Sequence, residues 1–236
     1  MARELGLRQA YQTIKNAYAA KGRSPVTTAS DLRLIVPISS SKTTFEFPVI
    51  VGDDQNNYPD AVLLNRADAF TATEIGLFIG KRLGATTAAQ VSQTAFDWYS
   101  YPNTSEFAVT STDATNLKPL FNGATINATI NNVQYLQNYS TLRMRRVPLQ
   151  QTGLGYGVHA TATASSVLST SLDSFSGEND GFYDLVPTLQ LSGTSKISIN
   201  ISVPQALPIA TAGTAQYCIM LAFRGFLSLG ASNLNK

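Results

Sequence analysis

The chain has 236 residues, of which 44% are hydrophobic and only 14% are charged. This length suffices for one large β domain, and the charged fraction is well below the roughly 25% of an ordinary soluble domain. Ser, Thr, Asn and Gln take the place of charges, which suits a protein that packs against copies of itself, because buried charge is costly at contacts. No apolar stretch approaches the ~18 residues that a membrane-spanning helix requires, and the single cysteine, Cys218, excludes an internal disulfide.

The net charge of +2 is distributed unevenly along the chain. Residues 1–23 hold an excess of basic side chains over the single acid Glu4, whereas the rest of the chain has a slight excess of acids. The basic residues of this segment are Arg3, Arg8, Lys15, Lys21 and Arg23. A basic segment ahead of a nearly neutral body indicates either an anionic partner or a solvated helix whose charges keep it soluble.

Residues 4–20 are predicted to form an amphipathic helix, because apolar side chains recur there at helical spacing. They are Leu7, Tyr11, Ile14 and Tyr18, and Gly22 and Pro25 end the pattern. A helix this short is not stable alone, so we expect it to dock on its own body, on a neighbouring subunit, or on a membrane or nucleic acid. The predicted organisation is a basic amphipathic N-terminal arm over residues 1–25 and a β body over residues 26–236.

Short apolar runs separated by turn residues predict strands throughout the body. The expected strands cover residues 32–38, 43–51, 61–64, 68–73, 75–79, 106–110, 125–130, 133–136, 142–147, 185–191, 196–203 and 217–229. Residues 26–31 are predicted to be a polar linker, and residues 52–59 and 98–103 to be loops. Residues 84–94 allow a short helix, and residues 150–184 are rich in loop-forming residues.

The clearest strand is Lys196–Val203, in which Ile and Val alternate with Ser and Asn. Successive side chains of a strand point to opposite faces, so this segment has one buried face and one solvated face. Tyr217–Leu229 is apolar on both faces, and we expect it to be buried and to pair with this strand. Asn131 and Asn132 join two other alternating runs, and they predict a hairpin turn because Asn tolerates positive φ.

Together these elements predict an all-β fold, an antiparallel β-sandwich of jelly-roll type with a short N-terminal helical arm. No helical pattern separates the strands, which excludes a parallel sheet with crossover helices. The varied loop lengths favour a jelly roll over an immunoglobulin topology. The order of the strands does not follow from the sequence.

Residue patterns of catalysis are sparse. His159 is the only histidine, and a catalytic triad or zinc site built on it lacks nearby partners. We interpret Asp53–Asp60 as a solvated turn, because its acids lack calcium-loop spacing. The glycines at 76–80 and 153–157 lack the spacing of phosphate or dinucleotide loops. We therefore expect no enzymatic activity, no cofactor, no metal and no small-molecule substrate.

Two clusters are candidate contact sites. The densest basic cluster consists of Arg143, Arg145 and Arg146, and it would contact acids of a neighbouring subunit or a phosphate backbone. On the strand predicted there, Arg143 and Arg145 would share a face. The aromatic cluster of Trp98, Tyr99 and Tyr101 would form a sugar-stacking platform or an anchor at a protein contact.

The segments AVLLNRADAFTATEIGLFIGK (61–81) and NNVQYLQNYSTLRMRRVPLQQ (131–151) resemble those of structural proteins from tailless bacteriophages. The similarity lies in Asp68–Phe70, in the apolar run after it, and in the arginine-rich run that ends at Val147-Pro148. The low charge and the basic arm also resemble jelly-roll capsid proteins. This resemblance implies an icosahedral shell of many copies, with arms that line its inner surface or connect subunits, and it carries over no site residues.

We accordingly expect a virion structural protein, most simply a major capsid protein that self-assembles into a phage shell after synthesis in the host cytoplasm. Its expected partners are further copies of itself, other virion proteins, and genome nucleic acid or an internal membrane contacted through the arm. The alternative is a phage fibre or spike, or a secreted β-sandwich, that binds carbohydrate or a receptor. A hydrolase is a third hypothesis.

Overall fold

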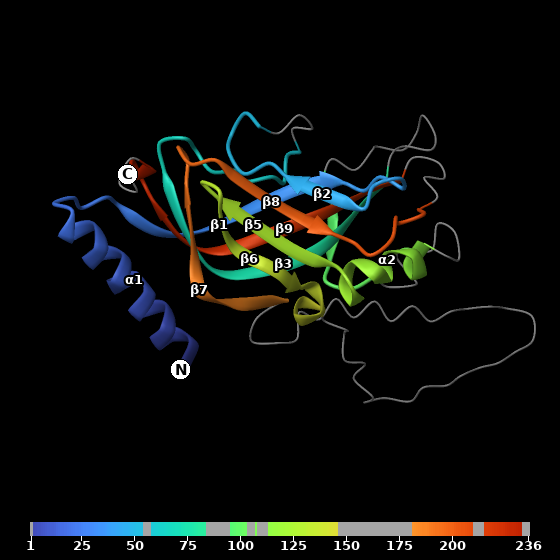
Figure 1. Cartoon of the computed structure of the whole chain (residues 1–236), viewed down its shortest axis with the longest axis horizontal. Coiled ribbons are helices and arrows are strands. Elements are labelled where there is room, and N and C mark those ends of the chain that lie inside the picture. The colour runs from blue at the N-terminus through green and yellow to red at the C-terminus, as the bar shows by residue number, and fades with distance from the viewer. Residues whose placement is uncertain are drawn as a thin grey trace, which may run out of the picture.

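The computed structural model describes residues 2–53, 58–83, 95–102, 107, 113–145, 181–209 and 215–232. Its elements are α1 (Ala2–Ala20), β1 (Thr27–Pro37), β2 (Thr44–Phe47), β3 (Ala69–Leu83), β4 (Asp97–Tyr99), α2 (Asp113–Asn122), β5 (Thr125–Ile130), β6 (Val133–Ser140), the 3-10 helix η1 (Thr141–Met144), β7 (Phe182–Ser192), β8 (Ile197–Ser202) and β9 (Ala215–Ser228). We call the sheet of β1, β9, β3, β4 and β7 sheet A, and the sheet of β2, β8, β5 and β6 sheet B. Figure 1 shows the two sheets as stacked layers, with α1 and α2 at opposite ends.

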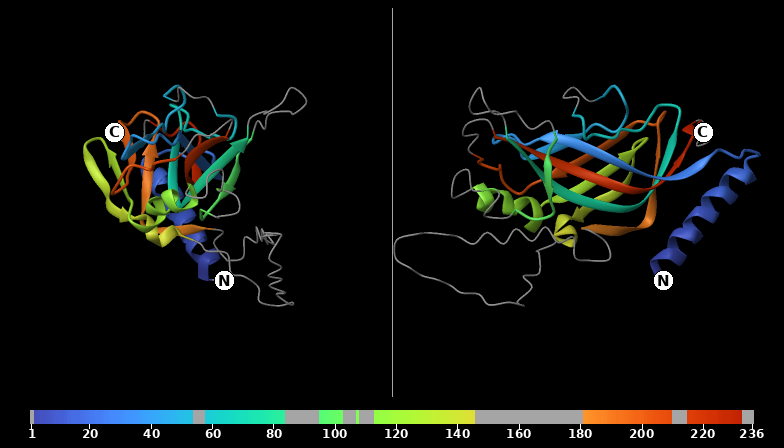
Figure 2. Two further views of the ribbon diagram at one scale, coloured as in Figure 1. Left: turned by 90° about the vertical axis from the view of Figure 1, so that its right-hand side faces the viewer. Right: turned by 180° about the vertical axis from the view of Figure 1, so that it is seen from behind.

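The strand order is that of a jelly roll. Sheet A runs β1-β9-β3 with β7 on the far edge of β3, and sheet B runs β2-β8-β5-β6. All of these pairs are antiparallel. Apart from the short β4, the remaining eight strands form two four-stranded layers, with most successive strands in opposite sheets, which is the jelly-roll architecture. The predicted β-sandwich with a short N-terminal helix is therefore confirmed, and Figure 2 shows its two layers from the end and from behind.

The main core lies between the two sheets. Leu34, Leu77 and Leu221 of sheet A are fully buried against Ile126 and Ile199 of sheet B. The alternation seen in the sequence determines these positions, because every second residue of each strand faces the opposite sheet. The strand expected at 196–203 and its buried Ile199 and Ile201 are thus confirmed.

The expected partnership of this strand with the C-terminal strand is wrong. β8 lies between β2 and β5 in sheet B, whereas β9 lies between β1 and β3 in sheet A. The chain crosses from one sheet to the other between β8 and β9, so neighbours in sequence are not neighbours in a sheet. β9 is apolar on both faces because its inner face packs into the main core and its outer face contributes to a second apolar cluster.

Several predicted boundaries also need correction. The two runs at 68–73 and 75–79 belong to the single strand β3, and a β-bulge between Ala72 and Glu74 breaks the alternation that suggested two strands. The predicted polar linker is instead the start of β1, because Thr27 pairs with Ser228, the last residue of β9. Residues 61–64 make only the isolated bridge of Val62 to Arg33 and that of Leu64 to Ile50.

The segment around the hairpin is partly as predicted. Asn131 and Asn132 have φ of 50° and 66°, and they connect β5 to β6 in the expected hairpin. The strand predicted at 142–147 is wrong, because Thr141–Met144 forms η1 and the segment therefore turns away from β6. The prediction for residues 84–94, that for 106–110 apart from Phe107, and those for 150–180 lie outside the described residues.

The two helices close opposite ends of the sandwich. α2, which the sequence did not predict, inserts the fully buried Leu117, Leu120 and Phe121 into the main core. α1 docks at the other end, where Ile14 is buried and the Tyr11 ring lies 5.6 Å from that of Phe226. No helix among the described residues is long and apolar enough to cross a membrane.

Candidate functional site

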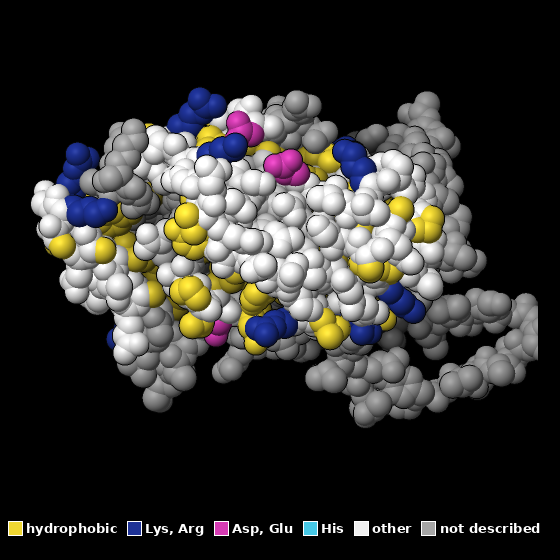
Figure 3. Space-filling model, viewed as in Figure 1, with side chains coloured by type: hydrophobic (Ala, Val, Ile, Leu, Met, Phe, Trp, Pro, Cys, Tyr) yellow, Lys and Arg dark blue, Asp and Glu magenta, His cyan; other side chains and the backbone are white. Residues whose placement is uncertain are grey.

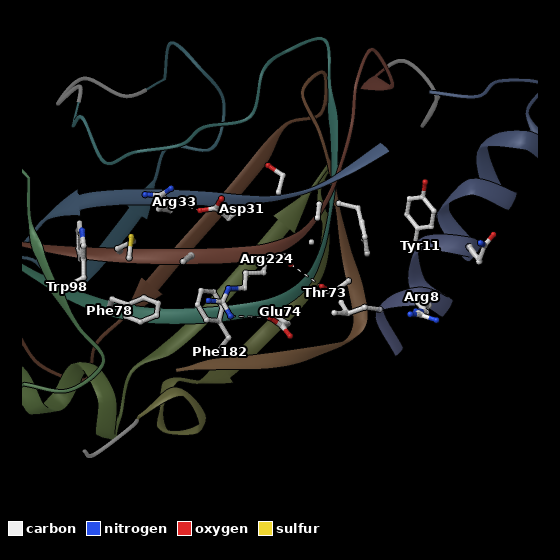
Figure 4. Close-up of a pocket in the computed structure, with 18 residues that line it drawn as sticks. Arg8, Tyr11, Asp31, Arg33, Thr73, Glu74, Phe78, Trp98, Phe182 and Arg224 are labelled. Atoms are coloured by element: carbon white, nitrogen blue, oxygen red, sulfur yellow. Dashed lines mark hydrogen bonds and ion pairs between the residues drawn. The ribbon is translucent and has the colours of Figure 1, made fainter. Parts of the chain in front are cut away.

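A groove of about 1200 Å³ lies between the outer face of sheet A and α1. Its floor is formed by side chains of β3, β7 and β9 that point away from the main core, and Trp98 of β4 stands at one end (Figure 4). Leu7, Arg8 and Tyr11 of α1 line the other end. The groove exists because α1 covers only one end of this sheet face.

The floor of the groove belongs to a second apolar cluster, separate from the main core. It is made by Phe78, Phe182, Met220 and Ala222 together with other buried residues, and Trp98 packs against it. Met220 and Ala222 alternate along β9 with residues of the main core, so the two apolar faces of this one strand serve two clusters. The sequence shows the apolar run but does not show that its second face opens onto a groove.

Charged side chains cross the middle of the groove. Arg33 Nε donates a hydrogen bond to Asp31 Oδ2 over 2.7 Å. Arg224 Nη1 lies 3.9 Å from Glu74 Oε2, and its guanidinium lies 3.8 Å from the centroid of the Phe182 ring. Arg224 therefore covers an apolar ring with its planar cation while it neutralises the buried Glu74 carboxylate.

The three aromatic residues proposed as a platform face different directions. Trp98 packs on Gly80 and Phe96 on the outer face of sheet A, with ring centroids of Trp98 and Phe96 5.3 Å apart. Tyr99, the next residue of β4, points to the other face and packs edge-on against Phe107. The Tyr101 ring lies beneath the guanidinium of Arg145. The rings do not combine into one flat sugar-binding surface.

The basic residues of the arm divide into two groups. Arg8 is exposed and lines the groove, and the Lys15 ammonium lies 5.5 Å from the Tyr11 ring. Lys21 and Arg23 are exposed just beyond the end of α1. Arg3 lies in α1, but its side chain is outside what the structure describes. Among the described side chains, Arg8, Lys15, Lys21 and Arg23 do not form one basic cluster.

The second basic cluster is used within the subunit. Arg143 lies over the rings of Tyr139 and Tyr183, at 5.4 and 5.6 Å from their centroids, and thereby joins β6 of sheet B to β7 of sheet A. Arg145 Nη1 donates to Asn122 Oδ1 over 3.0 Å, at the end of α2. The two arginines do not share a strand face, which corrects the prediction, and Arg146 lies outside the described residues.

Among the described residues, β6 and β7 form one side of the sandwich on which no further strand pairs. Each is the last strand of its sheet, and β6 contains no charged residue and pairs only with β5 among the described strands. Exposed apolar side chains follow this side, and we call them the edge patch: Val133, Tyr135, Leu142, Tyr183 and Val186. Val186 is 91% exposed. Exposed apolar side chains that lie together on a surface are typical of interaction sites.

The outer face of sheet B is flat, polar and almost uncharged. Thr125, Asn127 and Thr129 of β5 stand opposite Ser202, Asn200 and Ser198 of β8. Glu46 is the one acid of β2 beside them. Figure 3 shows this face as a broad uncharged area, with Lys, Arg, Asp and Glu mostly near its rim.

Other residues considered from the sequence have ordinary structural surroundings or cannot be placed. Asp60 Oδ2 accepts a hydrogen bond from the Phe96 backbone over 2.9 Å, whereas Asp54, Asn56 and His159 lie outside the described residues. Among the described residues, no three His, Cys, Asp or Glu side chains come together. Burial raises the pKa of the Cys218 thiol to about 12, against smaller opposing effects of Tyr58 and Arg82.

Comparison with known proteins gives no relative. No protein-family model, no curated protein and no solved structure matches the chain.

Proposed function

We propose that the protein is a virion structural protein, a capsid subunit that acts by self-assembly into a shell. The observation that carries this proposal is the β6–β7 side, where an uncharged edge strand lies beside the exposed apolar edge patch. Unpaired strand edges associate readily, and soluble proteins normally protect them with charged residues or proline. β7 carries Asp184 and Pro187, but β6 has neither a charged residue nor a proline. An edge strand such as β6 suits a molecule whose edge is covered by another copy.

The fold and the outer face of sheet B support the same proposal. The jelly roll occurs in viral capsid proteins, although it also occurs in lectin domains and cupins, so the fold alone assigns no function. A flat face of Ser, Thr and Asn side chains can be buried against a neighbour without stranding charges. Homotypic contacts with such faces and edges are the mechanism we assign to this chain.

The arm provides a further contact. α1 docks on its own body through Tyr11 and Ile14, and Arg8 and Lys15 lie exposed beside this stripe. We assign the basic residues of the arm to a neighbouring subunit, the genome or an internal membrane within the particle. The alternative function, carbohydrate or receptor binding, has less support because Trp98, Tyr99 and Tyr101 do not form one platform.

The proposal is tested by electron microscopy and light scattering of the purified chain, compared with Val133→Asp and Val186→Asp. We expect closed shells or lattices from the wild type and at least about a tenfold higher concentration requirement for either variant, because a carboxylate must lose its hydration at the contact. Val51→Asp is the matched control. Val51 is 54% exposed, close to the 56% of Val133, and it follows β2 at the opposite edge of sheet B.

Deletion of residues 1–23 tests the contribution of the arm to assembly. We expect altered or weaker assembly from a chain that still unfolds cooperatively. A wild-type chain that stays monomeric at high concentration, with neither the edge variants nor the deletion changing its association, contradicts the proposal.

A further inference from the structure

The groove between sheet A and α1 separates apolar from cationic groups along its length. Trp98, Phe78 and Met220 gather at one end, as Figure 4 shows for the two labelled rings. Arg33 and Arg224 lie toward its middle, and Arg8 projects from α1 at the far end. A ligand that follows this groove meets an apolar surface first and guanidinium groups second.

The charges of the groove favour an anion. Both acids that line it already face an arginine, since Asp31 accepts from Arg33 and Glu74 lies beside Arg224. Arg8 adds a third cation, so basic groups exceed acidic groups by one. Within the described part of the chain, Arg33 uses its Nε for Asp31, its two terminal nitrogens make no hydrogen bond or ion pair, and its side chain is 42% exposed.

The shape of the floor selects among anionic ligands. Phe78 and Phe182 are only 5% and 8% exposed, and Arg224 covers the Phe182 ring. Stacking of nucleic-acid bases needs open ring faces, which these two residues do not offer. A slender flexible hydrocarbon chain needs no open ring faces on the floor, because it can follow the edges of these side chains and gains most from the half-buried Trp98 at the apolar end.

We propose that this groove binds a single-chain amphiphile with an anionic head group, such as a medium-chain fatty acid. The hydrocarbon chain lies on Met220 and Phe78 toward Trp98, and the carboxylate receives hydrogen bonds from the terminal nitrogens of Arg33. This binding goes beyond the proposed role in assembly. It requires only the single subunit, because every residue of the site comes from one chain.

Trp98 makes the proposal directly measurable, because it is the only tryptophan of the chain. The full-length unassembled protein is titrated with dodecanoate below the concentration at which dodecanoate forms micelles, and Trp98 emission is recorded. We expect a saturable change. Dodecanoate brominated at its terminal carbon should quench Trp98 strongly, and dodecanoate brominated next to the carboxylate should quench it weakly, because the proposal places the chain end at Trp98.

Two variants test the two halves of the site. Arg33→Gln should weaken dodecanoate binding by about tenfold, because it removes a charge-assisted hydrogen bond. Arg66→Gln, at an exposed arginine outside the groove, should bind like the wild type. Ala222→Met should abolish binding by filling the floor, with circular dichroism used to verify its fold.

Five outcomes overturn the proposal. They are an absence of any saturable change with dodecanoate, equal quenching by the two brominated acids, equal affinity of wild type and Arg33→Gln, a response that occurs only with anionic phospholipid vesicles, and dodecanol that binds as tightly as dodecanoate. The last result would show that the arginines are not used. Failure of shell assembly leaves all of these measurements in place, so the two proposals fail separately.

Discussion

The two faces of sheet A bury apolar residues in different ways. On the inner face, Leu221 and its neighbours are enclosed by sheet B and are fully buried. On the outer face, Met220 and Ala222 pack with Phe78 and Phe182, Arg224 covers the Phe182 ring, and α1 covers only the end of the face near Phe226. One strand, β9, contributes to both faces.

The difference teaches that burial alone does not define a core. Both Met220 and Leu221 are less than a tenth exposed, yet only Leu221 is held by a second layer of backbone. The outer cover consists of side chains that can move without unfolding the sandwich. We infer that the inner face determines stability and that the outer face is available for binding.

The sharpest test of this comparison is truncation of adjacent residues on β9. Leu221→Ala should reduce the free energy of unfolding by about 4 kcal/mol, because the cavity is closed on all sides. Met220→Ala should cost about 2 kcal/mol, because the space it leaves joins the groove and water can enter it. Urea unfolding followed by circular dichroism measures both. Equal losses would mean that the outer face is as closed as the inner one.

A second test removes the charged cover of the outer face. Arg224→Ala should reduce the free energy of unfolding by about 2 to 3 kcal/mol, because it leaves the Glu74 carboxylate, whose side chain is 4% exposed, without this cation and uncovers Phe182. The matched control is Arg66→Ala, an exposed arginine for which a change within about 0.5 kcal/mol is expected. If the two variants are equally stable, Arg224 does not contribute to the cover.

The smallest expected effect concerns Cys218, at the far end of the outer cluster. Burial raises the pKa of this thiol to about 12, whereas an unfolded thiol has a pKa of about 8.5. Its contribution to stability is complete below about pH 8.5 and is lost as the pH rises toward 12, because only the unfolded state then releases the proton. Between pH 8 and 9.5 the wild type should lose about 1 kcal/mol more than Cys218→Ala, as measured by urea unfolding under reducing conditions.

The same thiol should react with thiol reagents at pH 8 only after unfolding, because its thiolate is scarce in the folded protein. Rapid modification of the native chain at pH 8 would show that the outer cluster opens readily around Cys218. That result would widen the contrast between the two faces.

Much of the fold could be predicted from local patterns, and the candidate site could be predicted only in part. Alternation identified β8 and its buried Ile199 and Ile201, and the Asn131-Asn132 pair identified the β5–β6 hairpin. The apolar stripe of α1 was visible as helical spacing, and Ile14 of that stripe is buried. Arg8 is singled out for its charge, but nothing in the sequence places it on a groove that residues of β9 also line.

Other elements escaped prediction for identifiable reasons. α2 contains Pro119 and only ten residues, so its helical pattern is weak, and its burial depends on the open end of the sandwich that it fills. The bulge in β3 breaks the two-residue repeat and divides one strand into two apparent ones. η1 comes directly after β6, and it forms at the point where the chain leaves sheet B.

The sequence by itself determined which residues of each strand face inward, because the direction of a side chain on a strand depends only on its immediate neighbours in the chain. The tertiary structure alone decided which strands pair, that β8 and β9 lie in different sheets, and that the second apolar face of β9 opens onto a groove. Those outcomes depend on contacts between segments far apart in the chain, and no local repeat encodes them.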